Sequence, residues 1–157
     1  MLTVGDIMVR RVVTVGLERS VRETAEVMVM FGIGSVVVIE DERAVGMITE
    51  SDILERVVAT GKDSSATSVR EIMSKPVIDV SPETLLEDAV TLMFNHNIKK
   101  LPVVEAKEGV KKLVGIVTLT DIARVQPMLL KVLRQLYMEA QEKPPKGIEK
   151  VMNFYIS

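Results

Sequence analysis

Two imperfect copies of one pattern fill most of this chain. Residues 6–8 (Asp-Ile-Met) return as 71–73 (Glu-Ile-Met), and each copy closes on Gly, two apolar residues, Thr, two variable residues and Asp, at 46–52 and again at 115–121. The second copy is longer around residues 105–112, where charged residues and a glycine are typical of an extended hairpin. Solenoid arrays need at least about three repeats to bury a continuous core. Two long copies therefore predict a closed, pseudo-symmetric pair.

Each copy has the pattern of a strand, a helix, two strands and a second helix. In the first copy the capping box at residues 20–23 begins a helix that ends before Gly32, and Thr84 and Glu87 form the same box in the second copy. Small polar residues at 61–68 link the copies. Apolar, β-branched runs predict strands at residues 11–15, 35–39, 44–49, 77–80, 100–104 and 113–118, with a second helix at 52–59.

Composition excludes several functional classes. The 157 residues carry 20 basic against 22 acidic side chains, so no basic field attracts a phosphate backbone, and nucleic acid is not expected as a partner. The absence of cysteine excludes disulfides, cysteine zinc sites and thiol nucleophiles. The longest uncharged stretch, residues 27–39, is shorter than the roughly 20 residues of a membrane helix, and residues 1–6 do not resemble a secretory signal. We expect a cytoplasmic protein that does not enter a membrane.

The closing signature predicts a corner that can hold a nucleotide. A strand brings a threonine hydroxyl and then an aspartate carboxylate to the start of the next helix in both copies. The alternative is that Ser51-Asp52 and Thr120-Asp121 are ordinary helix N-caps.

The ordered set of motifs resembles the cystathionine-β-synthase-type domain family, the CBS domains, which occur as tandem pairs. The resemblance covers roughly residues 2–125 and rests on the opening Asp-Ile-Met, a capped helix containing Met28 or Met93, residues 98–104 (Ile-Lys-Lys-Leu-Pro-Val-Val) and the closing Thr-x-x-Asp signature. It implies a mixed α/β (α+β) fold whose two repeats pack sheet to sheet as one module, with a C-terminal helical extension. We divide the chain into a first CBS repeat (1–62), a linker (63–68), a second CBS repeat (69–125) and the extension (126–157).

The resemblance implies a regulatory module, not an enzyme, that binds an adenosine-containing ligand in the cleft between the repeats. AMP is the first expectation, followed by ADP or ATP. Asp52 and Asp121 would accept hydrogen bonds from the ribose, since an ionised carboxylate only accepts and a ribose diol offers two donors. The phosphates would meet Thr49, Thr118, Ser35, Lys99 and Lys100 beside a helix N-terminus. The base would lie against one of two apolar sets, either Met8, Val12, Val13, Ile33 and Val36, or Met73, Pro76, Val77, Ile78, Ile98 and Leu101.

The two copies differ where the phosphate is expected. The second copy offers Lys99 and Lys100, whereas the first has Gly34 and Ser35 at the matching positions. We therefore expect one strong pocket. Pockets of the family draw residues from both repeats, so the sequence leaves open which closing signature shares a pocket with Lys99. The two lysines are equally compatible with a solvated strand end.

Beyond Asp121 the repeat ends, but apolar residues continue. Pro127 is typical of a first helical turn, and residues 128–137 carry apolar side chains at helical spacing. Residues 144–147 (Pro-Pro-Lys-Gly) end this helix, and residues 148–157 are too apolar for a fully solvated tail. We expect the extension to pack on the module or on a partner subunit, and the alternative is a frayed tail.

Three functional classes are compatible with the sequence. The first is an adenine-nucleotide sensor, a homodimer whose state is read by an unidentified protein partner, with the nucleotide as a regulatory ligand and no catalytic cofactor or metal. The second is a structural dimerisation or assembly module with little ligand affinity. The third is an enzyme, which the sequence disfavours because it has no Walker-type loop, paired catalytic histidine or metal cluster.

Overall fold

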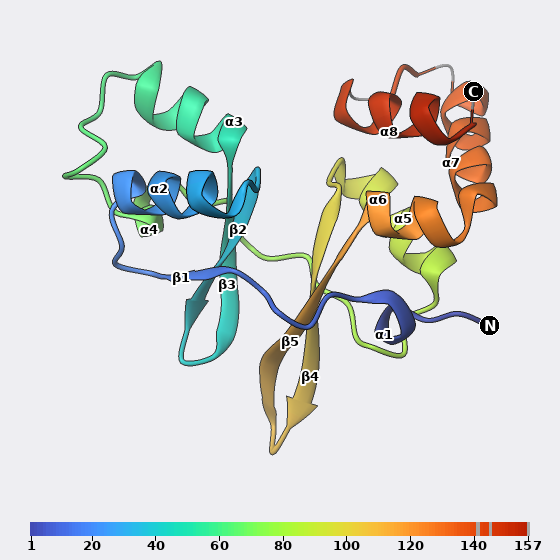
Figure 1. Ribbon diagram of the computed structural model, residues 1–157, viewed down its shortest axis with the longest axis horizontal. Coiled ribbons are helices and arrows are strands. Elements are labelled where there is room, and N and C mark those ends of the chain that lie inside the picture. Colours follow the sequence, from blue (N-terminus) through green and yellow to red (C-terminus); the bar gives the residue numbers. More distant parts are fainter. Residues whose placement is uncertain (141, 145, 157) are drawn as a thin grey trace. The chain divides into compact units, whose positions relative to one another are not determined.

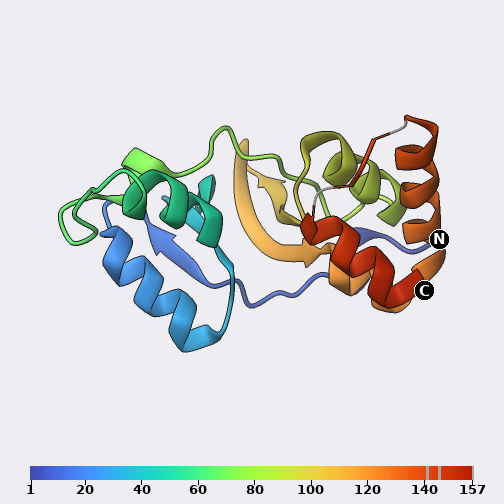
Figure 2. The same cartoon turned by 90° about the horizontal axis from the view of Figure 1, so that it is seen from above.

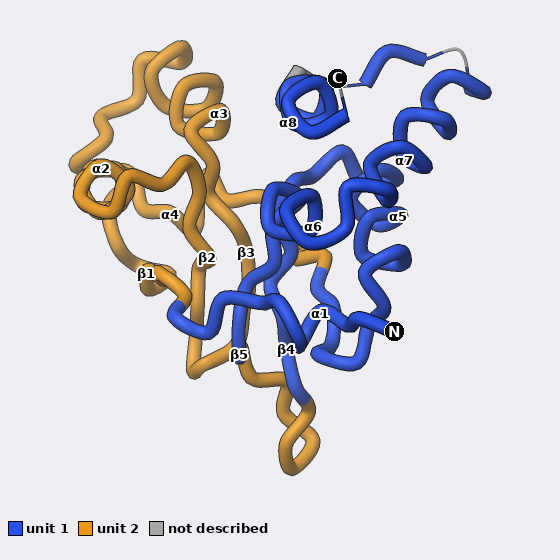
Figure 3. The backbone as a smooth tube through the Cα atoms, turned by 45° about the vertical axis from the view of Figure 1, so that its right-hand side comes forward, with its two compact units in different colours: residues 1–11, 79–105, 114–157 blue, residues 12–78, 106–113 orange. Residues whose placement is uncertain are grey.

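The computed structural model describes residues 1–140, 142–144 and 146–156, and it combines helices and strands in two compact units (Figure 1, Figure 3). Gln141, Pro145 and Ser157 of the expected extension lie outside the described residues. Unit 1 contains residues 1–11, 79–105 and 114–157, and unit 2 contains residues 12–78 and 106–113.

Unit 2 contains the sheet of the first copy, the helices that flank this sheet in the sequence, and one short helix from the start of the second copy. The strand order is β1-β2-β3, with β1 parallel and β3 antiparallel to β2. Val36, Val38 and Ile48 form its core together with Met28 and Ile72. Its elements are β1 (Thr14–Gly16), α2 (Val21–Phe31), β2 (Ser35–Glu40), β3 (Arg43–Thr49), α3 (Glu50–Ile53), the π-helix η1 (Leu54–Val58) and α4 (Val69–Ile72).

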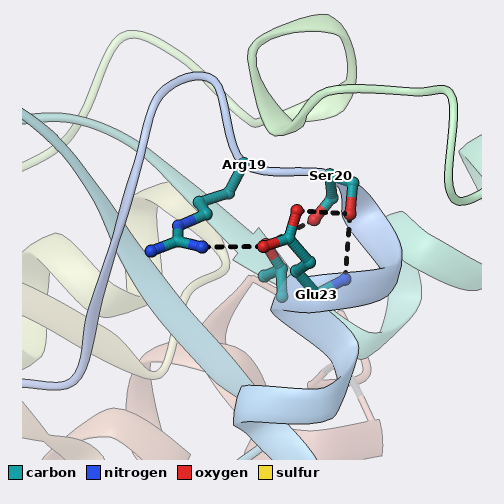
Figure 4. Close-up of polar contacts among 4 residues, drawn as sticks. Arg19, Ser20 and Glu23 are labelled. Carbon is teal, nitrogen blue, oxygen red and sulfur yellow. Dashed lines mark hydrogen bonds and ion pairs between the residues drawn. The ribbon is translucent and has the colours of Figure 1, made fainter.

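Helix α2 begins and ends where the sequence predicts. The Ser20 hydroxyl accepts a hydrogen bond from the Glu23 N–H (3.0 Å) and donates one to the Glu23 carboxylate (3.1 Å) (Figure 4). The Arg19 guanidinium at 2.7 Å, followed by hydrogen bonds that the Ser20 hydroxyl and the Ser20 backbone donate to the carboxylate, holds the pKa of Glu23 below its usual value. Gly32 ends the helix in the left-handed conformation (φ 62°), which glycine adopts without steric cost.

Unit 1 contains most of the second copy and the C-terminal extension. Strands β4 and β5 form a two-stranded sheet, and the tip of their hairpin, residues 106–113, belongs to unit 2. Gly109 adopts φ 77° in this tip, as the predicted long hairpin requires. The elements are α1 (Val4–Ile7), α5 (Leu86–His96), β4 (Lys100–Lys107), β5 (Val110–Thr118), α6 (Leu119–Val125), α7 (Pro127–Glu139) and α8 (Lys146–Ile156).

Several predicted element starts are wrong. The strand predicted at 77–80 is reduced to a single parallel bridge between Val80 and Val103, and β1 starts only at Thr14. Thr84 does not cap α5, because its hydroxyl accepts from the Ser81 N–H (3.1 Å). The helix predicted at 52–59 is a short α-helix that continues as a π-helix.

The two copies exchange their opening segments: the opening segment of each copy lies beside the closing strand of the other copy. Met47 in β3 exchanges two backbone hydrogen bonds with Ser74, at 3.1 and 2.9 Å. Val9 exchanges two with Ile116 in β5, both at 2.9 Å. Each compact unit therefore combines residues from both sequence repeats.

The two described helices of the extension pack within unit 1, on the helices of the second copy, as expected. Helix α7 contacts α5 and α6, and α8 contacts α6 and α7. The C-terminal helices are red and orange in Figure 1 and Figure 2. The Tyr137 ring lies edge-on to Phe94, with the ring centroids 4.4 Å apart. The buried side chains of the two C-terminal helices are Leu130, Leu133, Tyr137, Ile148 and Met152.

Candidate functional site

Both closing signatures are helix N-caps at a junction between a strand and a helix. The Thr49 hydroxyl accepts from the Asp52 N–H (3.1 Å), and the Asp52 carboxylate accepts from the Thr49 N–H (2.9 Å). The Thr118 hydroxyl accepts from the Asp121 N–H (3.0 Å). The N-cap residue is thus the threonine that ends the strand, not Ser51 or Thr120, and the aspartate occupies the third helical position.

The structure shows which residues share each corner. The Leu119 N–H, directly after Thr118, donates to the Lys99 carbonyl (2.8 Å). The matching bond in unit 2 runs from the Glu50 N–H to the Gly34 carbonyl (3.0 Å). Lys99 therefore belongs with the Thr118–Asp121 signature in unit 1, a pairing that the sequence left open.

Ser35 lies at the corner of unit 2. It pairs with Thr49 across β2 and β3, so the two side chains lie on the same face of the sheet. Val36, the next residue, points to the opposite face and into the core. Ser35 is only 8% exposed, and its hydroxyl has no hydrogen-bond partner among the residues that the structure describes. A buried unpaired hydroxyl costs about 1–3 kcal/mol, which a ligand group could recover.

The carboxylates of Asp52 and Asp121 differ in exposure and in the number of contacts that they already make within the protein. Asp52 is buried, and its second oxygen lies 3.4 Å from the Ser74 hydroxyl and 3.6 Å from the Arg56 guanidinium. The Asp121 side chain is 22% exposed and pairs with Arg124 at 3.8 Å. Asp121 consequently has more capacity to accept hydrogen bonds from a ligand.

The apolar residues expected around the base do not form the two predicted sets, because the opening segment of each copy lies in the same unit as the closing strand of the other copy. Val36 and Leu101 are 1% and 0% exposed, so they are core residues and offer no surface to a base. Val13, Ile33 and Met73 pack against the core of unit 2. Met8, Ile98 and Leu101 belong to unit 1, whereas unit 2 holds Val12, Val13, Ile33, Val36, Met73, Pro76, Val77 and Ile78.

Three residues near the corners were missed by the sequence analysis. Ser74 approaches Asp52, and Arg56 donates to the Ile72 carbonyl (2.6 Å), both through the exchanged opening segment. Gly147 of α8 faces the Lys99 side chain, whose Nζ would lie 2.8 Å from a Cβ at that glycine. These contacts depend on the exchange of the opening segments and on the docking of α8. Neither is visible in the sequence as a local motif.

The described part of the chain contains no cluster of three or more His, Asp or Glu side chains arranged to hold a metal ion. None of its helices has both the length and the apolar character needed to cross a membrane.

Comparison with known proteins identifies the family. The sequence profile of the CBS domain matches residues 4–59 and again residues 69–127. This chain belongs to the CBS domain family. The CBS pair is 38% identical over 123 residues to the CBS domain-containing protein YhcV of Bacillus subtilis, covering 78% of this chain and 84% of YhcV. It is also 37% identical over 143 residues to the uncharacterized protein MK0525 of Methanopyrus kandleri, covering 90% and 71% of the two chains.

A solved structure with the same fold contains adenosine compounds. The CBS domain pair of protein MJ0100, in complex with 5′-methylthioadenosine and S-adenosyl-L-methionine, superimposes with a TM-score of 0.70 at 27% identity. The similarity covers 82% of this chain and 98% of that one.

Proposed function

We propose that this CBS pair is a cytoplasmic regulatory module, not an enzyme, and that it binds AMP or a related adenine nucleotide. The observation that carries the proposal is the corner of unit 1, where the partly exposed Asp121 carboxylate follows the Thr118 cap and Lys99 lies alongside. This corner combines an acceptor for a ribose diol with cationic groups for a phosphate. The adenosine compounds named for the similar MJ0100 pair support the same ligand class.

In unit 1, Asp121 accepts hydrogen bonds from the ribose hydroxyls of the bound nucleotide. Thr118, Lys99 and Lys100 are the phosphate contacts. Met8 and Ile98 flank the base. Because Met8 comes from the first repeat, this site uses both halves of the sequence.

The corner of unit 2 is a second, weaker site for the same ligand class. The Ser35 hydroxyl supplies a hydrogen bond to the ligand, but the corner has no lysine corresponding to Lys99. The Asp52 carboxylate is already used by Thr49, Ser74 and Arg56. These contacts leave the Asp52 carboxylate with less capacity to accept hydrogen bonds from a ribose.

Calorimetric titration of AMP, ADP and ATP tests this ranking of the two sites. Asp121→Asn removes the charge of the carboxylate and keeps the backbone N–H that Thr118 caps. A hydrogen bond to a charged group contributes about 1.5–3 kcal/mol, so we expect roughly 10- to 100-fold weaker binding. Asp52→Asn should change the affinity less. Absence of binding by the folded, nucleotide-free protein would favour an assembly module with little ligand affinity.

The nucleotide acts through the assembly of the protein. The CBS pair forms a homodimer, and ligand occupancy shifts the balance between two arrangements that an unidentified protein partner reads. Such control requires that the ligand bind one arrangement more tightly than the other.

A further inference from the structure

The two corners carry opposite charges beside the junction of strand and helix. In unit 1 the Lys99 carbonyl accepts a hydrogen bond from Leu119, the first residue of α6. In unit 2 the same backbone bond joins Gly34 to Glu50, the first residue of α3. The corner of unit 1 therefore has a cationic and a neutral side chain at these positions, whereas the corner of unit 2 has a glycine and an anionic side chain.

The Glu50 carboxylate lies against the backbone at Gly34. A Cβ at Gly34 would lie 3.3 Å from Glu50 Cδ, and 3.4 and 3.5 Å from the two carboxylate oxygens. Among the residues that the structure describes, none forms an ion pair with Glu50. The carboxylate thus occupies the space where a side chain of residue 34 would begin, and its charge is not compensated there.

The ion pairs beside the two signatures leave this difference in charge in place. Arg56 lies 3.6 Å from Asp52 in unit 2, and Arg124 lies 3.8 Å from Asp121 in unit 1. Each signature carboxylate is therefore paired with one arginine. The corner of unit 2 keeps the negative charge of its first helical residue, whereas the corner of unit 1 keeps the positive charge of Lys99.

The polar groups of the unit 2 corner fit a nucleoside better than a phosphate. The Ser35 hydroxyl is buried, has no hydrogen-bond partner within the described part of the chain, and shares a face of the sheet with Thr49. This hydroxyl can bond a hydroxyl or an amine of a ligand. A phosphate at the same place would face the Glu50 carboxylate, and like charges repel more strongly beside a protein than in bulk water.

We propose that the corner of unit 2 selects an adenosine compound without phosphate whose 5′ group is positively charged, and that Glu50 sets this preference. The preference rests on the adenosine-binding function proposed above for both corners. A cationic 5′ group donates a charge-assisted hydrogen bond to the Glu50 carboxylate. Neutral adenosine gains less from this residue, and AMP binds this corner most weakly. The two units of one chain thus bind adenosine compounds of opposite charge.

Calorimetric titration of the full chain with three probes tests this preference. The double variant Lys99→Ala/Asp121→Asn, here called the unit 1 variant, loses the ribose acceptor and a phosphate contact of the other corner. The probes are 5′-amino-5′-deoxyadenosine, adenosine and AMP, which carry a positive, a neutral and a negative group at the same carbon. We expect the unit 1 variant to bind them in that order of decreasing affinity. Adding Ser35→Ala should weaken the binding of adenosine, which assigns the measured heat to unit 2.

Glu50→Gln in the unit 1 variant isolates the role of the charge. Removing one negative charge should raise the affinity for AMP roughly 10-fold, lower that for the amine by a similar factor and leave that for adenosine unchanged. A loss of structure would instead weaken all three probes. Glu40→Gln is the matched control, because Glu40 is exposed and ends β2, whereas Ser35 begins it. This control should change none of the three affinities.

Four results would overturn the proposal. AMP that binds the unit 1 variant more tightly than the amine would give the corner of unit 2 a preference for phosphate. Shifts of all three probes in one direction by Glu50→Gln would make Glu50 a structural residue. A unit 1 variant that binds no probe, while wild type binds AMP, would remove the site in unit 2 and leave the function proposed for unit 1. Wild type that binds no probe would remove both.

Discussion

The Met73 side chain lies directly over Gly46, and Met8 takes the same position over Gly115. Met73 Cγ would lie 2.9 Å from a Cβ at Gly46, and Met8 Sδ would lie 2.7 Å from a Cβ at Gly115. Real Cβ atoms do not approach other atoms this closely. The methionine that ends each opening motif therefore explains the glycine that begins the other copy's closing signature.

Alanine at either of these glycines should destabilise the fold. Gly46→Ala and Gly115→Ala overfill a packed contact, which typically costs about 1–3 kcal/mol of unfolding free energy. Urea unfolding measures this loss. Gly16→Ala is the control, because nothing lies within 4 Å of a Cβ there, and it should change stability little.

The double variant Gly46→Ala/Met73→Ala identifies the cause of that loss. Shortening Met73 removes the atoms that a Cβ at Gly46 would meet, so the two changes should cost less together than the sum of their separate costs. Strictly additive costs would show that the methionine is not the obstacle.

Ser35→Ala should have opposite effects on folding and on binding. The Ser35 hydroxyl is buried without a partner among the described residues, so its removal should leave the unfolding free energy of the ligand-free protein unchanged or raise it. The affinity of the weaker nucleotide site should fall. A clear loss of stability in the ligand-free protein would mean that the hydroxyl has a structural partner.

Docking of the extension should contribute measurably to stability. Leu133 is fully buried on α7, and Leu133→Ala should cost about 2–5 kcal/mol. Its neighbour Val132 is 56% exposed, so Val132→Ala should stay within about 0.5 kcal/mol of wild type in the same denaturant titration. Equal effects of the two variants would contradict the docked position of α7.

Alkaline pH should weaken the same contact. Burial, and to a smaller extent the charge of Glu142, raises the pKa of Tyr137 above its usual value of 10.0. The folded state thus favours the neutral phenol. The contribution of the neutral Tyr137 phenol to the free energy of unfolding is fully present below the unfolded-state pKa of about 10. It is lost as pH rises through the higher folded-state pKa.

Denaturant titrations between about pH 9 and 11.5 check this pH dependence, because that range spans the usual tyrosine pKa. The unfolding free energy of wild type should fall more steeply with pH than that of Tyr137→Phe. Tyr155→Phe keeps Tyr137 and should retain the wild-type slope. Identical slopes for Tyr137→Phe and wild type would rule out the tyrosine as the titrating group.

Local signals predicted those parts of the fold that depend on neighbouring residues. Ser20 and Gly32 set the bounds of α2, and Pro127 begins α7, because caps and fixed backbone angles act within one turn. Thr84 failed as a cap because its hydroxyl bonds Ser81 instead, a choice that depends on the path of the preceding loop. The exchange of opening segments depends on long-range pairing, such as Met47 with Ser74, which no local pattern encodes.

The candidate site was predictable to a similar extent. The Thr118 and Asp121 pair was found because its spacing is fixed by the junction of strand and helix. Val36 was misplaced because the first four residues of β2 are all buried, so no alternation of polar and apolar residues indicates which face a side chain occupies. Ser74 reaches Asp52 only through the exchanged segment and could not be linked to it from sequence.

Calorimetric titration of AMP into nucleotide-free wild type and Asp121→Asn tests the central claim most directly. We expect wild type to bind AMP with one strong site per chain, and Asp121→Asn to lose roughly 10- to 100-fold in affinity while keeping its fold. Equal AMP affinity in the two proteins would contradict the assignment of the ribose to Asp121. Folded wild type that gives no heat of binding at either of two temperatures would contradict the nucleotide-binding function.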